Sequence, residues 1–597
     1  ISAERPKVNI PDRMDRFGMY MKESGSKKDF IVPELDFFTA MDAYVEITGH
    51  LKLLKPAFIK ESVEDIREQF RDRKRKANVL SYNDLLEITE EGIRNDKTGY
   101  LTGRIRENYP LALVDEFQDT DPIQYGIFRK IYYDHPETGL FMIGDPKQAI
   151  YSFRGADIFT YLSAKKDTDE GQAYKLLYNY RSNKRMIEGV NNLFSVAEKP
   201  FLLEGLSFQA AQFPESKDDL DYIKDDSGDM INPLQFIELS NDSYTNKTEL
   251  NNSIYDIVSK EIAKVLSDNY TIKGKKIREK DIAVLVREGR EGEAIQASLR
   301  ELGISSVLRS RTSVFKTQEA DELFRILNAI LRISYEPGVR AALATSLLGF
   351  TAKDLIDLNE DGAQWVQLIH LFIKIREVWE ERGIEAAIDE LFLLFNVMQR
   401  ISEETVAERR ISNLIHISEL LSKAAREQQL HDKALLKWFY SKINQDDSKD
   451  SSEDEQLRLE SDEGLVQITT IHSSKGLQYP VVFCPFLWSS KATPKKDNIL
   501  KFYKGDFIHI DISQGADHPN KSDHVALTEK QNQAEDVRLT YVALTRAISA
   551  CYVILPNYRD VDHSPLGFIL SGNSEASKAD FSTIKETLET AKNIEVR

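Results

Sequence analysis

The sequence predicts an α/β protein built on parallel β-sheets, and three observations support this class. Two short apolar runs, Leu111–Val114 and Leu140–Ile143, each end in acidic or turn residues, as buried strands of a parallel sheet do. The stretch Pro122–Tyr132 between them has helical spacing, which gives a strand–helix–strand unit. Strands and helices alternate again over Asp281–Leu308. Residues Tyr335–Asn444 show only helical spacing, so we expect a helical unit to interrupt the second α/β region.

The bulk composition indicates a multidomain protein without a membrane partner. A chain of 597 residues is long enough for three or four domains. It contains no apolar run of membrane-spanning length, and its start does not resemble a signal peptide. Cys484 and Cys551 lie in apolar runs and are expected to be buried thiols, which suits a cytoplasmic location.

The net charge of −18 argues against a generally basic nucleic-acid coat, but a local basic groove is sufficient for binding. Much of the acid lies in residues 445–463, QDDSKDSSEDEQLRLESDE, which we expect to be a solvated linker.

The acidic pair Asp115-Glu116 follows the first predicted strand, at the edge of the sheet where ligands of parallel sheets bind. One carboxylate can hold Mg²⁺ through its water shell beside a nucleotide's phosphates, and the other can orient and deprotonate a water. Gln148 follows the second strand and is placed to sense a γ-phosphate. A lone acidic pair would more often be a solvated strand end, but the surrounding strings are long and specific.

These strings, DEFQDTD and GDPKQAIYSFRGAD, resemble motifs II and III of superfamily 1 helicases of the UvrD/Rep type. The continuation DIFTYL and the later string ERRISNLIHISELL are similar to the beta subunits of exodeoxyribonuclease V, the RecB group. The resemblance implies two RecA-like parallel-sheet motor domains, the first incomplete, with helical 1B and 2B insertions. The implied boundaries are 1–76 for 1B, 77–170 for motor domain 1A, 171–335 and 464–570 for motor domain 2A, 336–445 for 2B, 446–463 for the acidic linker and 571–597 for a polar tail.

The resemblance also implies the residues that bind and hydrolyse ATP with Mg²⁺. Tyr180 matches an aromatic residue that stacks on adenine, and Arg181 matches an arginine that reaches the γ-phosphate. Arg546 matches the arginine finger, while Arg538 on the same helix is expected to be structural. Gly476 lies in the turn of motif V. Gln478 stands where the family usually has Glu, which removes a charge beside the nucleotide.

A second set of residues is implied to contact single-stranded DNA. Tyr151 and Phe153 can stack on bases, with Arg154 beside them, although core packing of the two rings is the alternative. His472 and Lys475 of motif V match residues that face DNA.

One element of the family is missing from these 597 residues. No GxxxxGK[ST] sequence is present to wrap the phosphates in backbone N–H groups. Family members carry this P-loop before the 1B insertion and a nuclease domain after the motor. We therefore expect a partial chain that does not hydrolyse ATP efficiently alone and has no nuclease activity.

The function that the resemblance implies is the ATP-dependent 3′-to-5′ helicase motor of a helicase–nuclease that processes DNA double-strand breaks. Its expected partners are single-stranded and duplex-end DNA and the gamma- and alpha-type subunits, which are RecC-like and RecD-like. Two alternatives stay open: a non-hydrolysing DNA-binding paralogue, which Gln478 favours, and a stand-alone repair helicase of the UvrD type.

Overall fold

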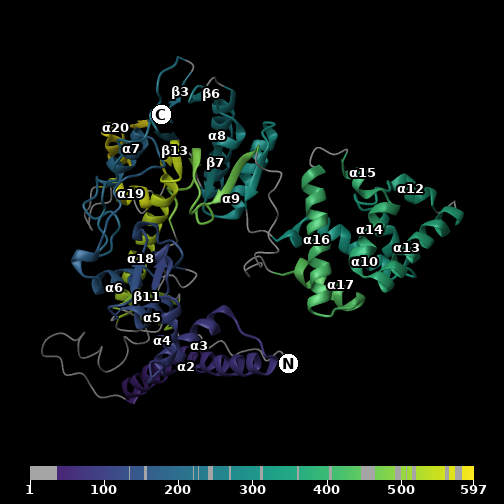
Figure 1. The fold of residues 1–597 in the computed structure, drawn as a ribbon, viewed down its shortest axis with the longest axis horizontal. Coiled ribbons are helices and arrows are strands. Elements are labelled where there is room, and N and C mark those ends of the chain that lie inside the picture. The colour runs from purple at the N-terminus through teal and green to yellow at the C-terminus, as the bar shows by residue number, and fades with distance from the viewer. Residues whose placement is uncertain are drawn as a thin grey trace.

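The fold is known from a computed structural model, which describes residues 36–133, 135–152, 157–219, 221–225, 227–239, 246–267, 270–309, 313–358, 362–402, 407–445, 464–490, 499–505, 507–513, 520–558, 564–571 and 581–597. Figure 1 shows N-terminal helices, a body that contains the sheets, and a separate group of helices. No helix in these ranges is both long and apolar enough to cross a membrane. The acidic segment 446–463 lies outside the described residues.

The N-terminal helices are α2 (Asp36–Ala77), α3 (Tyr82–Arg94) and α4 (Tyr100–Asn108). The helix α2 continues without a break through Pro56. Ser81 caps α3, and Asp84 in its first turn binds Lys74 of α2, so the cap also fixes the angle between the two helices. The first 35 residues of the expected 1B insertion lie outside the described ranges.

The strand–helix–strand unit is present as predicted. The strands β1 (Leu111–Val114) and β2 (Gly139–Met142) pair in parallel, with Leu111 opposite Gly139. Between them lies α5 (Pro122–Tyr132), whose first turn is capped by Asp121 and opened by Pro122. The short helices η2 (Phe117–Asp119) and η3 (Pro146–Gln148) follow the two strands, and α6 (Ile158–Asp167) closes the unit.

The expectation that these strands are buried is wrong. Leu113 is 68% exposed and Phe141 is 55% exposed. The sheet has only two strands among the described residues, and the side chains of Leu111, Leu113 and Phe141 are exposed along it.

The second sheet has seven parallel strands in the order β14-β4-β13-β10-β7-β9-β8. Their bounds are β4 (Leu234–Leu239), β7 (Ile282–Val286), β8 (Ser306–Arg309), β9 (Val466–Thr470), β10 (Tyr479–Cys484), β13 (Ala547–Pro556) and β14 (Ile594–Val596). Alternate residues of β7 enter two different cores. Ala283 and Leu285 join the core under the following helices: α7 (Lys184–Phe194), α18 (Lys521–Leu544), α19 (Pro565–Leu570) and α20 (Phe581–Thr590). Ile282, Val284 and Val286 join the core under α8 (Lys247–Ser267) and α9 (Gly289–Glu301). The sheet is therefore covered on both faces.

The C-terminal segment corrects one expected boundary. Residues 571–597 were expected to be a polar tail, but α20 and β14 lie within them, and Ile594 of β14 pairs with Leu234 of β4. This pairing makes the segment part of the second sheet.

Small elements complete the body. A three-stranded sheet consists of β3 (Ile223–Lys224), β5 (Thr271–Ile272) and β6 (Lys275–Lys276), and it includes the Gly274-Lys275-Lys276 sequence in a surface hairpin. A second hairpin, β11 (Leu500–Lys504) with β12 (Phe507–Asp511), packs on α18. The remaining short helices are η5 (Glu170–Gln172) and η6 (Glu279–Asp281).

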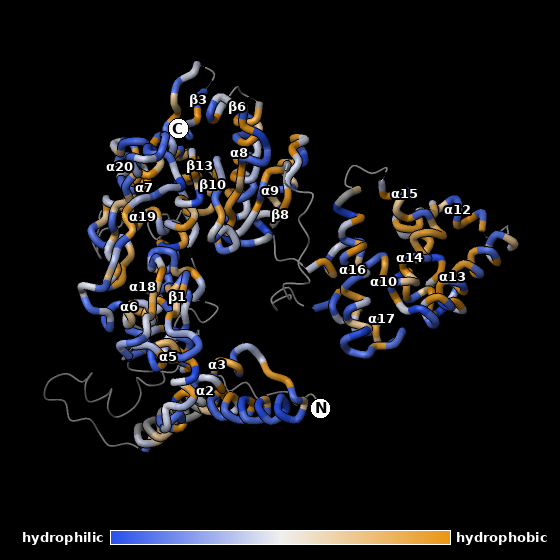
Figure 2. Tube along the Cα trace, viewed as in Figure 1, coloured by the Kyte–Doolittle hydropathy of each residue, from blue (hydrophilic) through white to orange (hydrophobic). Residues whose placement is uncertain are grey.

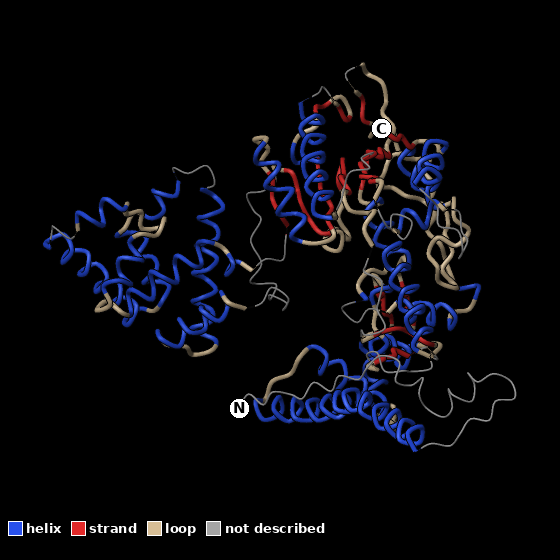
Figure 3. The backbone as a smooth tube through the Cα atoms, turned by 180° about the vertical axis from the view of Figure 1, so that it is seen from behind, coloured by secondary structure: helices blue, strands red, loops and turns tan. Residues whose placement is uncertain are grey.

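The predicted helical unit has its own core. It contains η7 (Val314–Lys316), α10 (Gln318–Leu331), α11 (Glu336–Leu343), α12 (Ala352–Asp357), α13 (Gly362–Arg382), α14 (Ile384–Leu394), α15 (Val397–Ser402), α16 (Ala407–Glu427) and α17 (Asp432–Ile443). Its apolar residues gather inside it, as Figure 2 shows, and Figure 3 shows only helices and loops there. Because Val314 and α10 belong to this core, the unit begins about twenty residues before the expected boundary at 336.

Candidate active site

The acidic pair lies at the carboxyl end of β1, beside the end of β2. The backbone N–H of Glu116 donates to Oδ1 of Asp115 at 2.8 Å, and Glu116 has a left-handed φ of 50°. That conformation costs a non-glycine residue roughly 1–2 kcal/mol, and such strain is often found at functional sites. Both carboxylates are exposed, so they are accessible to a metal ion and its waters.

The carboxylates fit Mg²⁺, which usually takes one or two carboxylates and completes its coordination with water and substrate phosphates. Among the described residues, no group of three or more His, Cys, Asp or Glu side chains is arranged to hold a metal ion by itself. Asp115 and Glu116 are therefore suited to a metal that arrives with a nucleotide.

Gln148 joins two parts of the body, here called the first lobe (the β1–α5–β2 unit with η2, η3 and α6) and the second lobe (the seven-stranded sheet with its helices). It lies at the end of η3, and its Nε2 donates to Oδ2 of Asp145 at 3.0 Å. Its Oε1 accepts a hydrogen bond from Nη2 of Arg546 at 3.4 Å. The predicted sensor of the first lobe thus contacts the predicted finger of the second.

Arg546 follows α18 and is fully buried. Its Nε donates to the carbonyl of Val542 and its Nη1 to the carbonyl of Leu477. Burial and the nearby Arg181 lower the pKa of Arg546 to about 10, while Glu116 acts in the opposite direction. The guanidinium therefore stays charged at neutral pH and interacts electrostatically with Glu116.

Arg181 lies in the same electrostatic neighbourhood. Its Nε donates to Oε1 of Gln478 at 3.1 Å, and its Nη1 donates to the carbonyl of Thr545. Burial lowers the pKa of Arg181, and Glu116 is among the groups that raise it. The structure thus brings together five residues that lie far apart in the sequence: Glu116, Gln148, Arg181, Gln478 and Arg546.

Lys475, predicted to face DNA, does not lie on an open surface. Its side chain is only 5% exposed and forms ion pairs with Asp119 and, at 3.3 Å, with Glu116. Its ammonium group lies 5.1 Å from the ring centre of Tyr151. Burial raises the pKa of Asp119, and Lys475 counteracts this shift. Asp119 was not singled out in the sequence, although it stands inside the DEFQDTD string.

Tyr151 and His472, predicted to contact DNA, lie together. The hydroxyl of Tyr151 donates to the carbonyl of His472 at 2.9 Å, and the ring centres are 6.3 Å apart. Phe153 and Arg154 lie outside the described residues. Tyr180 is 64% exposed, which leaves its ring free to stack on a ligand. Gly476 has a φ of 83° in the turn between β9 and β10.

Arg538 has the structural character that was expected of it. It is buried on α18, and its Nε donates to the carbonyl of Ala149 at 2.7 Å. Three residues earlier on the helix, Glu535 accepts a hydrogen bond from Ser152. The helix that Arg546 follows, α18, therefore also contacts the segment after Gln148.

Comparisons with known proteins agree with this two-lobed arrangement, which is that of a helicase motor. The model of the UvrD/REP helicase N-terminal domain matches residues 50–169, and that of the UvrD-like helicase C-terminal domain matches residues 174–558. The chain belongs to the UvrD-like helicase family.

Similar proteins within the family are RecB subunits of the RecBCD enzyme. That of Escherichia coli K12 is 33% identical over 606 residues, covering 98% of this chain and 50% of the relative. That of Haemophilus influenzae is 36% identical over 539 residues, covering 88% and 42%. The RecB subunit of Buchnera aphidicola from Acyrthosiphon pisum is 32% identical, covering 91% and 48%. The chain spans about half the length of these relatives.

Proposed function

We propose that the chain forms the ATP-driven motor of a 3′-to-5′ DNA helicase of the RecB type, acting at the ends of broken duplex DNA. The observation that supports this most directly is the contact of Arg546 with Gln148, beside Arg181 and Glu116. Charged side chains of both lobes lie close together there. Such a site can change the relative position of the lobes when ATP binds or is hydrolysed.

The roles of the residues follow from their chemistry. Mg²⁺ bound with ATP neutralises charge on the phosphates, and Asp115 would hold this ion through its waters. Glu116 would orient and deprotonate the attacking water. Arg181 and Arg546 would place planar, permanently charged groups against the phosphate oxygens. Tyr180 would stack on adenine.

Arg546 reaches phosphate only if its present contact changes. Its Nη2 is occupied by the amide oxygen of Gln148, and its side chain is fully buried. A γ-phosphate would take the place of that amide oxygen, so ATP binding would break the Gln148 contact and shift the segment that carries Tyr151. Through this exchange, the presence of ATP would change the position of the residues assigned to DNA.

We assign five residues to contacts with single-stranded DNA: Tyr151, Phe153, Arg154, His472 and Lys475. For Lys475 the assignment requires that DNA binding draws the ammonium group away from Glu116 and Asp119. In the absence of DNA, Lys475 positions Glu116 through its ion pairs.

The remaining parts of the proposal come from the relatives. Since their names describe subunits of the RecBCD enzyme, we propose RecC-like and RecD-like partners and a cytoplasmic location. We also propose that ATP hydrolysis depends on a P-loop outside these 597 residues, because no GxxxxGK[ST] sequence occurs within them.

A second candidate is a DNA-binding relative that does not hydrolyse ATP. The observation in its favour is Gln478, whose amide oxygen is engaged by Arg181. The upstream sequence of the natural gene product separates the two, since a P-loop there supports the motor and its absence supports the second candidate.

The test of the motor is DNA-stimulated ATPase activity of the full gene product that contains this chain. Glu116→Gln is expected to abolish hydrolysis while nucleotide binding persists. Glu107→Gln, an exposed carboxylate of the same lobe, is the matched control and should leave the rate unchanged. A gene product with a P-loop that shows no DNA-stimulated hydrolysis would rule out the proposal.

A further inference from the structure

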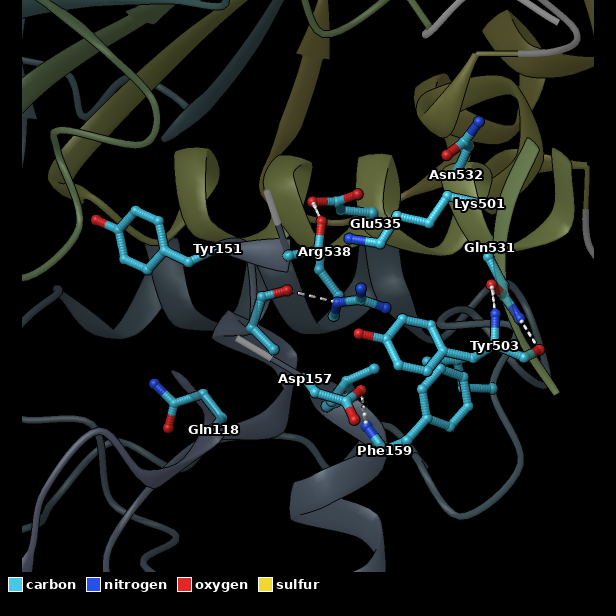
Figure 4. Close-up of a pocket in the computed structure, with 14 residues that line it drawn as sticks. Gln118, Tyr151, Asp157, Phe159, Lys501, Tyr503, Gln531, Asn532, Glu535 and Arg538 are labelled. Carbon is cyan, nitrogen blue, oxygen red and sulfur yellow. Dashed lines mark hydrogen bonds between the residues drawn. The ribbon is translucent and has the colours of Figure 1, made fainter. Parts of the chain in front are cut away.

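A buried glutamine lies between the two strand ends of the first lobe. Gln118 belongs to η2 and is only 1% exposed, although it follows the accessible Glu116 by two residues. A polar side chain of this size is normally buried only where hydrogen bonds satisfy it. Gln118 lines the cavity drawn in Figure 4, but its amide group points away from Arg538 and Tyr503 there. The amide is therefore directed to other partners.

Two hydrogen bonds fix the orientation of this amide. Its Oε1 accepts from the backbone N–H of Asp145, after β2, at 2.9 Å. Because a backbone N–H can only donate, the amide oxygen must lie at that position, and Nε2 must lie on the other side. There, Nε2 donates to Oε2 of Glu116. Gln118 thus connects the carboxylate that follows β1 to the turn that follows β2.

The contact holds one oxygen of Glu116 and leaves the other accessible. Lys475 also contacts Oε2, at 3.3 Å, and the side chain of Glu116 is 54% exposed. Neither of these contacts uses Oε1. A general base needs this arrangement, since its orientation must be fixed while one oxygen stays free to accept a proton from water.

A series of hydrogen bonds continues from Gln118 to the second lobe. Asp145, whose backbone binds Gln118, accepts from Nε2 of Gln148 through Oδ2 at 3.0 Å. Its other oxygen, Oδ1, pairs with Lys147 at 2.7 Å, so both carboxylate oxygens are held. Gln148 in turn accepts from Nη2 of Arg546. Four hydrogen bonds therefore join the acidic pair to the arginine, and Gln118 makes the first two.

We propose that Gln118 is a positioning residue for ATP hydrolysis, which orients Glu116 and couples its orientation to Gln148. The inference rests on the proposed function, in which Glu116 deprotonates the attacking water. Gln118 matters most when DNA is bound. If DNA draws Lys475 away, Gln118 is the donor that remains on Oε2 of Glu116.

The experiment measures DNA-stimulated ATPase activity and equilibrium ATP binding in the full gene product that contains this chain. Gln118→Met keeps the length of the side chain and removes its donor and its acceptor. Gln118→Glu keeps an acceptor for the N–H of Asp145 but places an oxygen, not a donor, against Glu116. Both variants should lower kcat at least about tenfold, while the Kd for ATP changes by less than about twofold.

A second glutamine of the same lobe provides the matched control. Gln124 is half-buried in the first turn of α5, and its Oε1 accepts from the backbone N–H of Asp121 at 3.2 Å. Gln124→Met removes a backbone contact without touching the acidic pair, so it should lower the melting temperature and leave kcat within about twofold. A purely structural role of Gln118 would give the same pattern. Gln118→Glu keeps this comparison possible if Gln118→Met does not fold.

The hydrogen-bond series provides a second readout. Gln148→Leu, alone and combined with Gln118→Glu, completes a double-mutant cycle in kcat. If the two residues act through Asp145, the double variant should be at most about threefold slower than the slower single variant. Independent effects would multiply, and that result would overturn the coupling.

Unchanged turnover in both Gln118 variants, with normal DNA-stimulated hydrolysis in the unaltered gene product, would overturn this inference and leave the proposed function standing. Absence of that hydrolysis in the unaltered gene product would overturn the proposed function itself. Equal losses of kcat and of ATP affinity would contradict a positioning role, because they would indicate that the whole site is disrupted.

Discussion

Nη2 of Arg546 lies 3.4 Å from Oε1 of Gln148, although 398 positions separate the two residues in the chain. The contact links the turn between α18 and β13 in the second lobe to η3 in the first. Two residues of α18, Arg538 and Glu535, bind Ala149 and Ser152, so the helix that Arg546 follows also contacts the segment after Gln148. Arg546 and α18 together thus contact residues 148–152 at three points.

The first prediction concerns Arg546 as the proposed arginine finger. In the full gene product, Arg546→Ala is expected to lower kcat for ATP by about 10³–10⁵ with a much smaller change in nucleotide affinity. Arg546→Lys retains the charge but not the forked geometry, so it should recover only part of the rate. Steady-state kinetics and equilibrium nucleotide binding distinguish the two effects. Equal losses in turnover and affinity would argue against the finger assignment.

The second prediction concerns Lys475, whose ammonium group pairs with the carboxylates of Glu116 and Asp119. Lys475→Met keeps the length of the side chain but leaves Asp119 without its partner. Burial already raises the pKa of Asp119, and without Lys475 it should rise further. A raised carboxyl pKa means that stability is lost as pH increases through the folded-state value, so the variant should be weakest at neutral and alkaline pH. Thermal melts across pH measure this.

Adding Asp119→Asn to Lys475→Met removes the unpaired charge and should restore part of the melting temperature at neutral pH. If the double variant melts no higher than Lys475→Met, the buried carboxylate is not the source of the instability.

The third prediction compares two glycines. A Cβ on Gly144 would lie 2.4 Å from Oε1 of Gln118 and 3.1 Å from the backbone nitrogen of Phe117, so Gly144→Ala should destabilise the first lobe by about 1–3 kcal/mol. Gly126 lies exposed within α5 and has no atom within 4 Å of the added carbon, so Gly126→Ala should stabilise by up to about 1 kcal/mol. Denaturant unfolding of both variants measures whether the free energy of unfolding falls for Gly144→Ala and rises for Gly126→Ala.

The fourth prediction concerns acid stability of the N-terminal helices. Lys74 and the capping contacts of Ser81 lower the pKa of Asp84 from 3.8 to about 2. A lowered carboxyl pKa contributes stability that is present above the ordinary value and is lost as pH falls from about 4 toward 2. Asp84→Asn should therefore reduce the stability of α3 at neutral pH and flatten its acid dependence. Hydrogen exchange of residues 82–94 at pH 7 and pH 3 measures this, and an unchanged acid profile would contradict it.

The sequence was informative where the structure depends on local contacts. The apolar runs before Asp115 and Gly144 and the helical spacing between them correctly predicted the β1–α5–β2 unit, because each element is specified by its own residues. The helical unit was predicted for the same reason, since its apolar stripes are visible within single helices.

The order of the second sheet could not be predicted in this way. β10 lies between β7 and β13, which come from distant parts of the chain, and only tertiary packing selects these neighbours. β14 has three residues, too few for a recognisable pattern, and it forms because β4 offers a free edge. The Lys475–Asp119 pair spans 356 positions, so neither residue's surroundings in the sequence indicated the other.

The entry and exit of the helical unit have a mechanical consequence. β8 precedes the unit, β9 follows it, and the two strands are hydrogen-bonded neighbours at one border of the sheet, with β8 outermost. The helical unit is thus inserted between two strands that are neighbours at the border of the sheet. A rotation of the unit about these two strand ends would leave the strand pairings of the sheet unchanged, because β8 and β9 pair only with strands of the sheet.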